Sequence, residues 1–334
     1  MRTYKMSEEE KAYLEKYNIE DFERPSVAAD MAVFAIMKED GGEAGGRLEN
    51  YRKDPEQKLK LLLIKRGSYP YKNEWALPGG FCRKGESTLE TARRELCEET
   101  GIKDAYLRPF DIFSEPGRDP RGWIISHAFL TLVNGENYRV HAGSDAWEAG
   151  WFSISIEKKE LCREIEEEKA HIRNCYYLKL ICEGKQDPGL EKKGLEADKK
   201  RTELGAEIIE DRYFHNYHET IDYEIVRSEG IGFDHAKVIL CAFLALQKEV
   251  NENGRPVFDL MPERFTLTAL QKAFEIVQGK KLLVANFRRK IADYVIETDE
   301  IAEGAGHRPA KLFRRNLERF YEQKESFLTL ITQT

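Results

Sequence analysis

Three carboxylates are spaced so that they would share one face of a helix. Glu95, Glu98 and Glu99 stand at positions i, i+3 and i+4, and residues with these separations are neighbours on a helix surface. Like charges held so close repel one another and weaken an isolated helix unless a cation neutralises them. Hard divalent ions prefer oxygen ligands of this kind. The spacing therefore predicts a binding site for Mg²⁺ or Mn²⁺ on this helix.

Other residues of the same stretch are placed to support such a site. Glu86 lies at the expected start of the helix and Arg94 two turns later, so a carboxylate and a guanidinium can pair and hold the preceding loop on the helix. Gly80 lets the backbone approach a ligand closely where loop and helix meet. The alternative is an ordinary solvated helix rich in Glu and Arg. The complete filling of a long pattern favours the functional interpretation.

The stretch resembles the Nudix hydrolase signature in full. The signature reads G-x5-E-x7-R-E-U-x-E-E-x-G-U with U aliphatic, and it matches Gly80 to Ile102 without a departure. The resemblance implies a Nudix fold and cleavage of a nucleoside diphosphate linked to another moiety, through metal-assisted attack of water on phosphorus. It also implies roles for individual residues, in which Glu95, Glu98, Glu99 and the Gly80 carbonyl bind metal, Glu98 and Glu99 serve catalysis, and Arg94 and Glu86 orient them.

The segments outside this signature suggest a substrate. Arg118 and Arg121 flank an Asp-Pro turn and can present forked donors to phosphate or ribose oxygens, although a surface turn with incidental arginines explains the spacing equally well. The segment from Phe113 to Trp123 resembles the arginine-rich loop of a Nudix subgroup associated with ADP-ribose, which favours that substrate. Arg66 and Gly80 are further candidates for substrate binding.

A general base is harder to assign. Glu148 lies in the region from which Nudix enzymes often recruit one. A solvated loop carboxylate is an equally good interpretation of this residue.

The C-terminal block has the pattern of a winged helix-turn-helix. We expect a helix from Thr268 to Val277, a break at Gly279, a second helix from Leu283 to Val295, and two strands around Gly304-Ala-Gly306. From Arg264 to Arg319 there are twelve Lys and Arg against seven Asp and Glu, whereas the whole chain carries −7. A basic module on an acidic body indicates a polyanionic partner, although solubility alone explains most charge runs.

This block also resembles a known type of domain. The segments Phe265 to Gln271, Asn286 to Lys290 and Gly306 to Phe313, with Gly232 to His235 before a long helix, resemble the Nudix-related transcriptional regulators of NAD metabolism. Double-stranded DNA would then be the partner. The alternative is a packing or dimerisation domain with a solvated basic face. The candidate contacts to bases or phosphates are Asn286, Arg288, Arg289 and Lys290 on the second helix and His307 and Arg308 at the hairpin tip.

The expected fold is an α/β (α+β) Nudix fold, with a mixed sheet sandwiched between helices, followed by a winged helix-turn-helix domain. We divide the chain of 334 residues into a Nudix domain (1–155), an inserted α/β elaboration with a mobile charged connector (156–230), a helix joining or completing the Nudix domain (231–255) and a winged-helix domain (256–334). The expected strands are Met31 to Met37, Lys58 to Lys65, Ala105 to Phe113 and Trp123 to Leu132. The expected helices are Ser7 to Tyr17, Ser87 to Thr100 and Asp234 to Val250.

Composition excludes some classes of protein. The six cysteines are scattered and include no C-x-x-C pair, so they indicate neither a zinc site nor a disulfide framework. The longest apolar run, Val238 to Leu246, is too short to span a bilayer. We expect a cytoplasmic protein without a membrane partner. A homodimer would suit paired DNA half-sites.

Two functions remain open at this level. The first is a Mg²⁺-dependent or Mn²⁺-dependent Nudix pyrophosphatase that cleaves ADP-ribose or a close relative to AMP and ribose 5-phosphate, with the appended domain serving dimerisation or autoregulation. The second is a DNA-binding repressor whose Nudix domain senses an ADP-ribose-type ligand. The undamaged carboxylate pattern favours hydrolysis, whereas the winged helix favours regulation.

Overall fold

The computed structural model describes residues 6–38, 57–103, 105–133, 146–183, 201–216, 218–302 and 310–319. The helices within these ranges are α1 (Glu8–Lys16), α2 (Thr88–Thr100), α4 (His235–Asn253), α5 (Arg255–Asp259), α6 (Leu267–Gln278) and α7 (Val284–Ile291), with short 3-10 turns η1 (Ile19–Asp21) and η3 (Ala292–Tyr294). The strands are β1 (Ser26–Lys38), β2 (Gln57–Arg66), β3 (Trp75–Ala76), β4 (Gly79–Phe81), β5 (Arg108–Phe113), β6 (Ile124–Val133), β7 (Ala146–Ile165), β8 (Lys169–Glu183), β9 (Arg201–His215), β10 (His218–Glu229), β11 (Val295–Ile301) and β12 (Lys311–Arg315).

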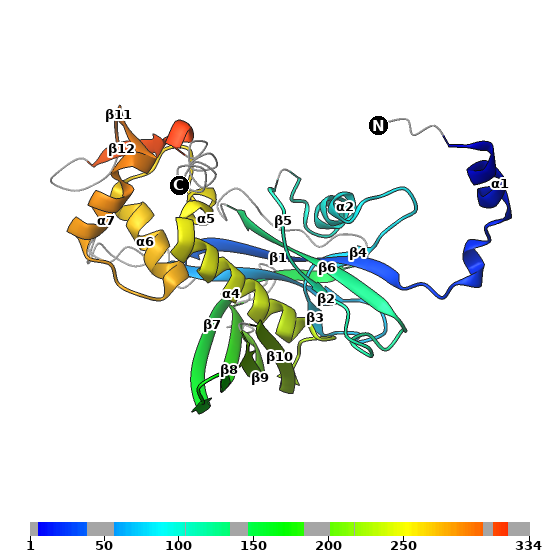
Figure 1. The fold of residues 1–334 in the computed structure, drawn as a ribbon. Coiled ribbons are helices and arrows are strands. Elements are labelled where there is room, and N and C mark those ends of the chain that lie inside the picture. The colour runs from blue at the N-terminus through cyan, green and yellow to red at the C-terminus, as the bar shows by residue number, and fades with distance from the viewer. Residues whose placement is uncertain are drawn as a thin grey trace, which may run out of the picture.

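A mixed sheet lies between helices, which confirms the predicted fold class. Its strands run in the order β10-β9-β8-β7-β2-β1-β6-β5, with β3 paired to β2 and β4 paired to β1. Strand β1 pairs in parallel with β6 and antiparallel with β2. Successive side chains of a strand point to opposite faces, so Met31 and Val33 pack with the α2 side of the sheet while Ala32 and Phe34 pack with the α4 side. Figure 1 shows α2 and α4 on the two sides of β1 and β2.

The first half of β7 pairs with β2 and its second half pairs with β8. We call this second half together with β8, β9 and β10 the sheet extension, which projects away from β1 and β2 in Figure 1.

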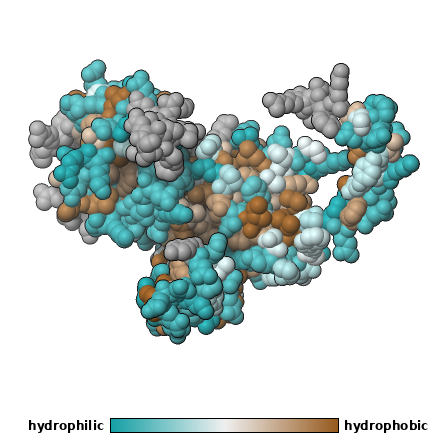
Figure 2. Space-filling view, viewed as in Figure 1, coloured by the Kyte–Doolittle hydropathy of each residue, from teal (hydrophilic) through white to brown (hydrophobic). Residues whose placement is uncertain are grey.

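The expected domain boundary at residue 155 lies inside β7. Much of the expected mobile connector, residues 184–200, lies outside the described residues, and so does most of the expected loop from Asp40 to Gln57. On the face in Figure 2 the sheet extension is mainly hydrophilic.

Helix α4 covers the face of the sheet opposite α2. Its apolar residues recur at helical spacing, and Ile239, Leu240, Ala242 and Leu246 are fully buried. The helix ends where Gly254 takes the left-handed conformation with φ 66°, which glycine adopts without strain. Within the described part of the chain, no helix is long and apolar enough to cross a membrane.

The last described elements form the winged helix-turn-helix that the sequence predicts. Thr266 caps α6 by accepting a hydrogen bond from the Ala269 backbone, and Gly279 ends it with φ 65°. The second helix, α7, is shorter than expected because Val295 already belongs to β11, where it pairs with Arg315 of β12. The rings of Phe258, Phe265, Phe274 and Phe287 pack edge to face in its core.

A single apolar cluster runs from the sheet through α4 into the winged-helix domain. Because α4 belongs to this shared core, we expect Leu246→Ala to destabilise the whole chain by about 3 kcal/mol. The exposed Lys248→Ala on the same helix serves as control and should change stability by less than about 0.5 kcal/mol. Urea unfolding can be followed by tryptophan fluorescence and by helical circular dichroism, since all four tryptophans precede Phe152. Both signals should show one shared transition, and two separated transitions would contradict a common core.

Candidate active site

Helix α2 is fixed at both ends by local contacts. Ser87 and Glu90 form a reciprocal capping box at its start, and Gly101 ends it with φ 78°, as the sequence predicts. Ala92 and Leu96 are fully or almost fully buried against the sheet, so they form the apolar face of the helix. Cys97 is only half-buried. This packing turns the carboxylates of the opposite face toward the loop that contains Gly80.

Arg94 holds that loop on the helix, as predicted. Its Nε and Nη2 donate to the two oxygens of Glu86 at 2.8 and 3.0 Å, and Nη2 also donates to the Phe81 carbonyl at 3.2 Å. The hydrogen bond from Arg94 and a second one from the Arg83 backbone lower the pKa of Glu86 to about 2. The loop is therefore tied to α2 by charge-assisted hydrogen bonds.

Gly80 lies directly against a carboxylate of α2. A Cβ atom at this position would collide with both carboxylate oxygens of Glu95, so a larger residue here would push this carboxylate away from the loop. Glu95 is also paired with Nη1 of Arg94 at 2.5 Å. The predicted neighbours Gly80 and Glu95 thus meet in the structure.

The other two carboxylates have different surroundings. Glu98 is half-exposed and lies 3.4 Å from both Arg83 and Arg94. Glu99 is largely withdrawn from water and accepts a hydrogen bond from the Gly79 backbone at 2.9 Å. Burial raises the pKa of Glu99 to about 8, the Gly79 hydrogen bond opposes this shift, and the charges of Glu95 and Asp30 add to it.

This set of donors fits a hard divalent ion by its chemistry. Glu99 and Glu95 lie against the Gly79 and Gly80 backbone and Glu98 follows on the same helix, and a cation would relieve their mutual repulsion. Among the described residues, however, no three His, Cys, Asp or Glu side chains converge as a metal-binding group. Arg94 engages Glu95 and Glu98 instead. Ion binding therefore requires these two carboxylates to turn away from Arg94.

Beside the carboxylates lies a cavity of about 90 Å³, which we call the carboxylate cavity. Its volume is small beside the roughly 300–1,000 Å³ typical of sites that enclose a small molecule, so it can take a phosphate-sized part of a ligand. Its polar and aromatic lining consists of Asp30, Arg66, Gly79, Gly80, Phe81, Arg118, Asp119, Arg121, Phe233 and His235. The four predicted substrate-binding residues, Arg66, Gly80, Arg118 and Arg121, are all among them.

Two arginines give this cavity its positive charge. Arg66 lies over the ring of Phe233 at 4.7 Å, and no ion pair is found for it in the described ranges. Burial and the nearby charge of Arg121 lower the pKa of Arg66. Arg121 lies 4.8 Å from the ring centre of Phe81 and 5.2 Å from that of Phe233, and its fork engages Asp119. An anion here would relieve the repulsion between the two cations.

Arg118 forms an ion pair that the sequence does not predict. Its side chain is 6% exposed, and its Nε and Nη2 donate to both oxygens of Asp234 at 2.9 and 2.8 Å. Its Nη2 also lies 3.8 Å from Asp30. Arg118 therefore lines the cavity, but its fork connects the turn before β6 to the first turn of α4.

Several lining residues were missed by sequence reasoning. Asp30 is buried within β1 and accepts a hydrogen bond from Ser126, and a lone acid beside an apolar strand was the available signal. His235 accepts a hydrogen bond from the Leu77 backbone at 2.9 Å, which leaves it a structural role beside the site. Phe233 has φ 56°, which places its ring next to Arg66 and Arg121. The place of Phe233 in the cavity depends on contacts between segments that are far apart in the sequence, so sequence patterns alone do not predict it.

Glu148 is not brought to this site. It lies on β7 rather than in a loop, opposite Lys65 of β2, and the two side chains pair at 3.6 Å. Its side chain is 54% exposed, and Glu148 is not among the residues that line the carboxylate cavity. The structure therefore offers no contact that supports Glu148 as a general base.

The candidate DNA contacts lie together on α7. Asn286, Arg288, Arg289 and Lys290 are all exposed, while Phe287 and Ile291 of the same helix are buried. One face of α7 thus packs into the domain and the other presents basic and amide groups. His307 and Arg308 lie outside the described residues.

Two sequence families match separate parts of the chain. Residues 51–173 match the NUDIX domain, and residues 257–315 match the NrtR DNA-binding winged helix domain. These ranges coincide with the carboxylate site and with the helices α6 and α7.

Individual proteins resemble the chain over different lengths. The "ADPR responsive transcriptional repressor NtrR" of Acinetobacter baylyi is 27% identical over 315 residues, covering 92% of this chain and 89% of that protein. The "ADP-ribose pyrophosphatase" of Methanocaldococcus jannaschii is 44% identical over 101 residues, covering 30% of this chain and 58% of that protein. A MutT/nudix family protein from Enterococcus faecalis has a similar fold, with a TM-score of 0.60 at 23% identity, covering 94% of this chain and 95% of its own.

The raised pKa of Glu99 predicts how stability changes with pH. The folded chain holds this proton up to about pH 8, whereas the unfolded chain releases it near the ordinary value of 4.5. The contribution of Glu99 to stability is therefore complete below pH 4.5 and is lost as the pH rises toward 8. In EDTA, the free energy of unfolding of the wild type should fall relative to that of Glu99→Gln between pH 5 and pH 8, as measured by urea unfolding. If the free energy of unfolding changes with pH in the same way for both proteins, the raised pKa of Glu99 is contradicted.

Proposed function

The chain belongs to the Nudix proteins that carry an NrtR-type DNA-binding winged-helix domain, and on this premise we propose that it is a transcription regulator controlled by a nucleotide-linked ligand. The ligand would bind in the carboxylate cavity, and ADP-ribose is the first candidate. The alternative of a DNA-binding regulator is thus favoured over a pyrophosphatase whose winged-helix domain is accessory.

The position of α4 carries this proposal. Phe233 and His235 at its start line the carboxylate cavity, while its later turns pack against α5 and α6 of the winged-helix domain. One buried helix therefore contacts both the ligand site and the DNA-binding domain, as can be followed in Figure 1. A ligand with different affinities for two positions of α4 would shift the population of DNA-binding chains.

The surface of α7 supports DNA as the partner. Its exposed Asn286, Arg288, Arg289 and Lys290 occupy the second helix of a helix-turn-helix, the element that enters the major groove in such domains. Arginine and lysine there can contact phosphates, and asparagine can read a base edge. Paired half-sites would suit a dimer of the chain.

The charges of the carboxylate cavity support a diphosphate as the part of the ligand that binds there. Arg66 and Arg121 line the cavity, and so do Gly79 and Gly80, whose backbone is contacted by Glu99 and Glu95 of α2. A diphosphate held by the two arginines would therefore lie next to these carboxylates, and a divalent ion bound to it would meet their negative charge. Mg²⁺ or Mn²⁺ would be held by the three carboxylates and the Gly80 carbonyl. The names of the Acinetobacter and Methanocaldococcus relatives both support ADP-ribose.

Hydrolysis of the same ligand is a second candidate function, favoured by the complete carboxylate set. A bound divalent ion would activate water and polarise the phosphorus. Within the chain, the pair of Arg94 and Glu86 would hold the loop against α2. Arg66 and Arg121 would bind the diphosphate oxygens. Regulation does not require turnover, so the two activities can be measured separately.

We expect DNA binding to depend on α7. Arg288→Ala combined with Arg289→Ala should weaken binding to a duplex selected from a random library by about tenfold or more and flatten its salt dependence, because phosphate contacts release counterions. Fluorescence anisotropy at several salt concentrations measures both effects. The matched control, Arg201→Ala with Arg227→Ala, removes two exposed arginines of the sheet extension and should leave affinity unchanged. A wild type without salt-dependent binding would overturn the proposal.

ADP-ribose should change the affinity of the chain for that duplex. Arg66→Gln should raise the ADP-ribose concentration needed by about tenfold, since it removes a charged contact to the ligand. The exposed Arg93→Gln on α2 is the control and should respond like the wild type. If ADP-ribose binds but leaves DNA affinity unchanged, the regulatory coupling is absent.

We expect Glu98→Gln to lower AMP release from ADP-ribose by about a hundredfold or more in Mg²⁺ or Mn²⁺, because a metal-bound carboxylate is lost. The DNA response to ADP-ribose should survive in this variant. Glu148→Gln is the comparison, and its turnover should stay within about tenfold of wild type because Glu148 lies outside the cavity. Wild-type turnover in Glu98→Gln would remove the metal assignment, and a loss in Glu148→Gln would restore the general-base role.

A further inference from the structure

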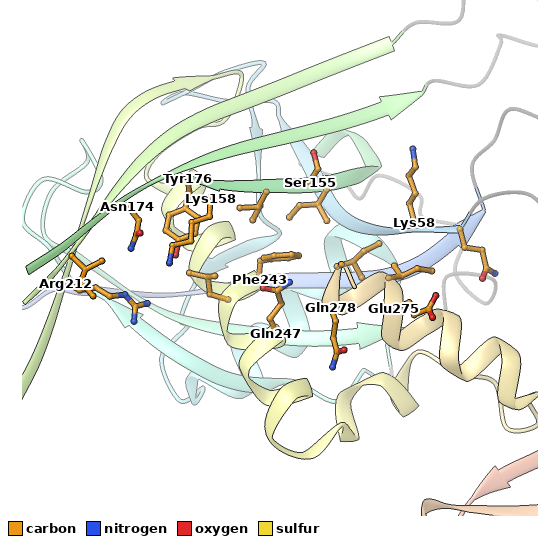
Figure 3. A pocket seen from close by; sticks show the side chains of 18 of the residues that line it. Lys58, Ser155, Lys158, Asn174, Tyr176, Arg212, Phe243, Gln247, Glu275 and Gln278 are labelled. Atoms are coloured by element: carbon orange, nitrogen blue, oxygen red, sulfur yellow. The ribbon is translucent and has the colours of Figure 1, made fainter. Parts of the chain in front are cut away.

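A second and much larger cavity lies between the sheet extension and the helices α4 and α6. Its volume is about 830 Å³, within the range of roughly 300–1,000 Å³ found for small-molecule sites. It shares no lining residue with the carboxylate cavity. Figure 3 shows side chains of β7, β8 and β9 on one side of the space and side chains of α4 and α6 on the other. We call it the junction cavity.

The strands line this cavity with alternate residues, as a pleated sheet requires. Strand β8 contributes Ile172, Asn174 and Tyr176, β9 contributes Arg212 and Phe214, and β7 contributes Ile154, Ile156 and Lys158 together with Ser155 and Arg163. Apart from Ser155 and Arg163, the residues of each strand are spaced by two positions, so these rows belong to one face of the sheet. The face is apolar except at the end where Asn174, Tyr176, Lys158 and Arg212 lie together in Figure 3.

That polar end has donor and acceptor groups without partners. Asn174 is completely buried, and its Nδ2 donates to the buried carboxylate of Glu210 at 2.8 Å. Its Oδ1 has no hydrogen-bond partner, and neither has Nε of Arg212, although both atoms are buried. Buried polar atoms are rarely left unpaired, because this costs stability. Both atoms are closed to solvent as they stand, so a ligand that donates to Asn174 and accepts from Arg212 would satisfy both after a shift of these side chains toward the cavity.

The charge of the lining favours an anion. The cations that line the cavity are Lys58, Lys158, Arg163 and Arg212, and the only acid among the lining residues is Glu275. Glu210 and Glu219 already pair with Arg212, and Glu160 pairs with Arg163. Lys158 lies 5.6 Å from the ring centre of Tyr176, and no ion pair is found for it among the described residues. The ammonium group of Lys158 is therefore available to a ligand.

The opposite wall comes from both domains and combines apolar side chains with Gln247, Glu275 and Gln278. Phe243 and Leu244 of α4 and Ile276 of α6 face the isoleucines of the sheet extension. We propose that the junction cavity is a second small-molecule site, which binds an organic anion with an apolar ring system. The ring would lie between the isoleucines and Phe243, and the anionic group would lie near Lys158 and Arg212. Such a ligand would contact the Nudix domain and the winged-helix domain at once.

Anilinonaphthalene sulfonate is a suitable probe, since it combines an apolar ring system, an N–H donor and a sulfonate. We expect saturable binding at one site of the full chain, with enhanced and blue-shifted fluorescence. Lys158→Glu should weaken this binding by about tenfold or more, because it replaces an attraction with a repulsion. Lys159→Glu is the matched control, since the adjacent side chain points to the other face of β7, and its affinity should stay within about twofold of wild type.

A second variant tests the volume of the site. Ile156→Trp should occupy the space beside Phe243 that the ring system of the dye needs and so abolish dye binding, while near-UV circular dichroism shows that the fold is kept. The proposal would be overturned if Lys158→Glu and Lys159→Glu lost equal affinity for the dye, or if Lys158→Glu bound the dye like the wild type. Arg66→Gln should leave dye binding unchanged, and loss there would place the dye at the carboxylate cavity and also overturn it. Lys158→Glu should still bind ADP-ribose, so failure of this site is distinguishable from failure of the proposed function.

Discussion

The buried pair of Arg118 and Asp234 is the constraint on which the arrangement of the chain depends. Both side chains are almost fully enclosed, and breaking such a pair from one side leaves an uncompensated charge at a cost of about 3–5 kcal/mol. The pair need not add net stability, because desolvation offsets the attraction. It does fix where α4 begins relative to the sheet. From this point α4 covers the sheet and reaches the winged-helix domain, where the shared apolar core completes its placement.

Within the carboxylate site, acidic side chains lie on α2 and basic side chains line the adjoining cavity. Burial beside other acids raises the pKa of Glu99, while burial beside another cation lowers that of Arg66. Both shifts favour the neutral form of the group, and burial is the largest cause of each. Under the proposed function, a ligand that carries a cation and an anion next to each other would bring a counter-charge to each group, and a metal-bound diphosphate is such a ligand.

Local sequence patterns predict the parts of the site that local structure builds. The spacing of Glu95, Glu98 and Glu99 fixes their common face because helix geometry does so, and the Glu86–Arg94 pair follows within the same segment. Asp30 and Phe233 could not be assigned this way, since they reach the cavity only after β1 and the start of α4 meet. Arg118 lines the cavity, but its ion pair with Asp234 could not be predicted, because Asp234 lies 116 positions away. The second helix of the winged domain was overextended because the pairing of Val295 with Arg315 overrides its helical pattern.

The order of the elements along the chain has a consequence for biosynthesis. All of the described strands of the large sheet precede α4, yet α4 covers the apolar face formed by Leu178, Leu180, Leu204 and Ile208. During translation this face has no cover until α4 has left the ribosome. Exposed apolar strands are prone to aggregate during such an interval. The chain therefore depends on rapid docking of a late helix, and a ribosome stalled before residue 235 would release a sheet without its second layer.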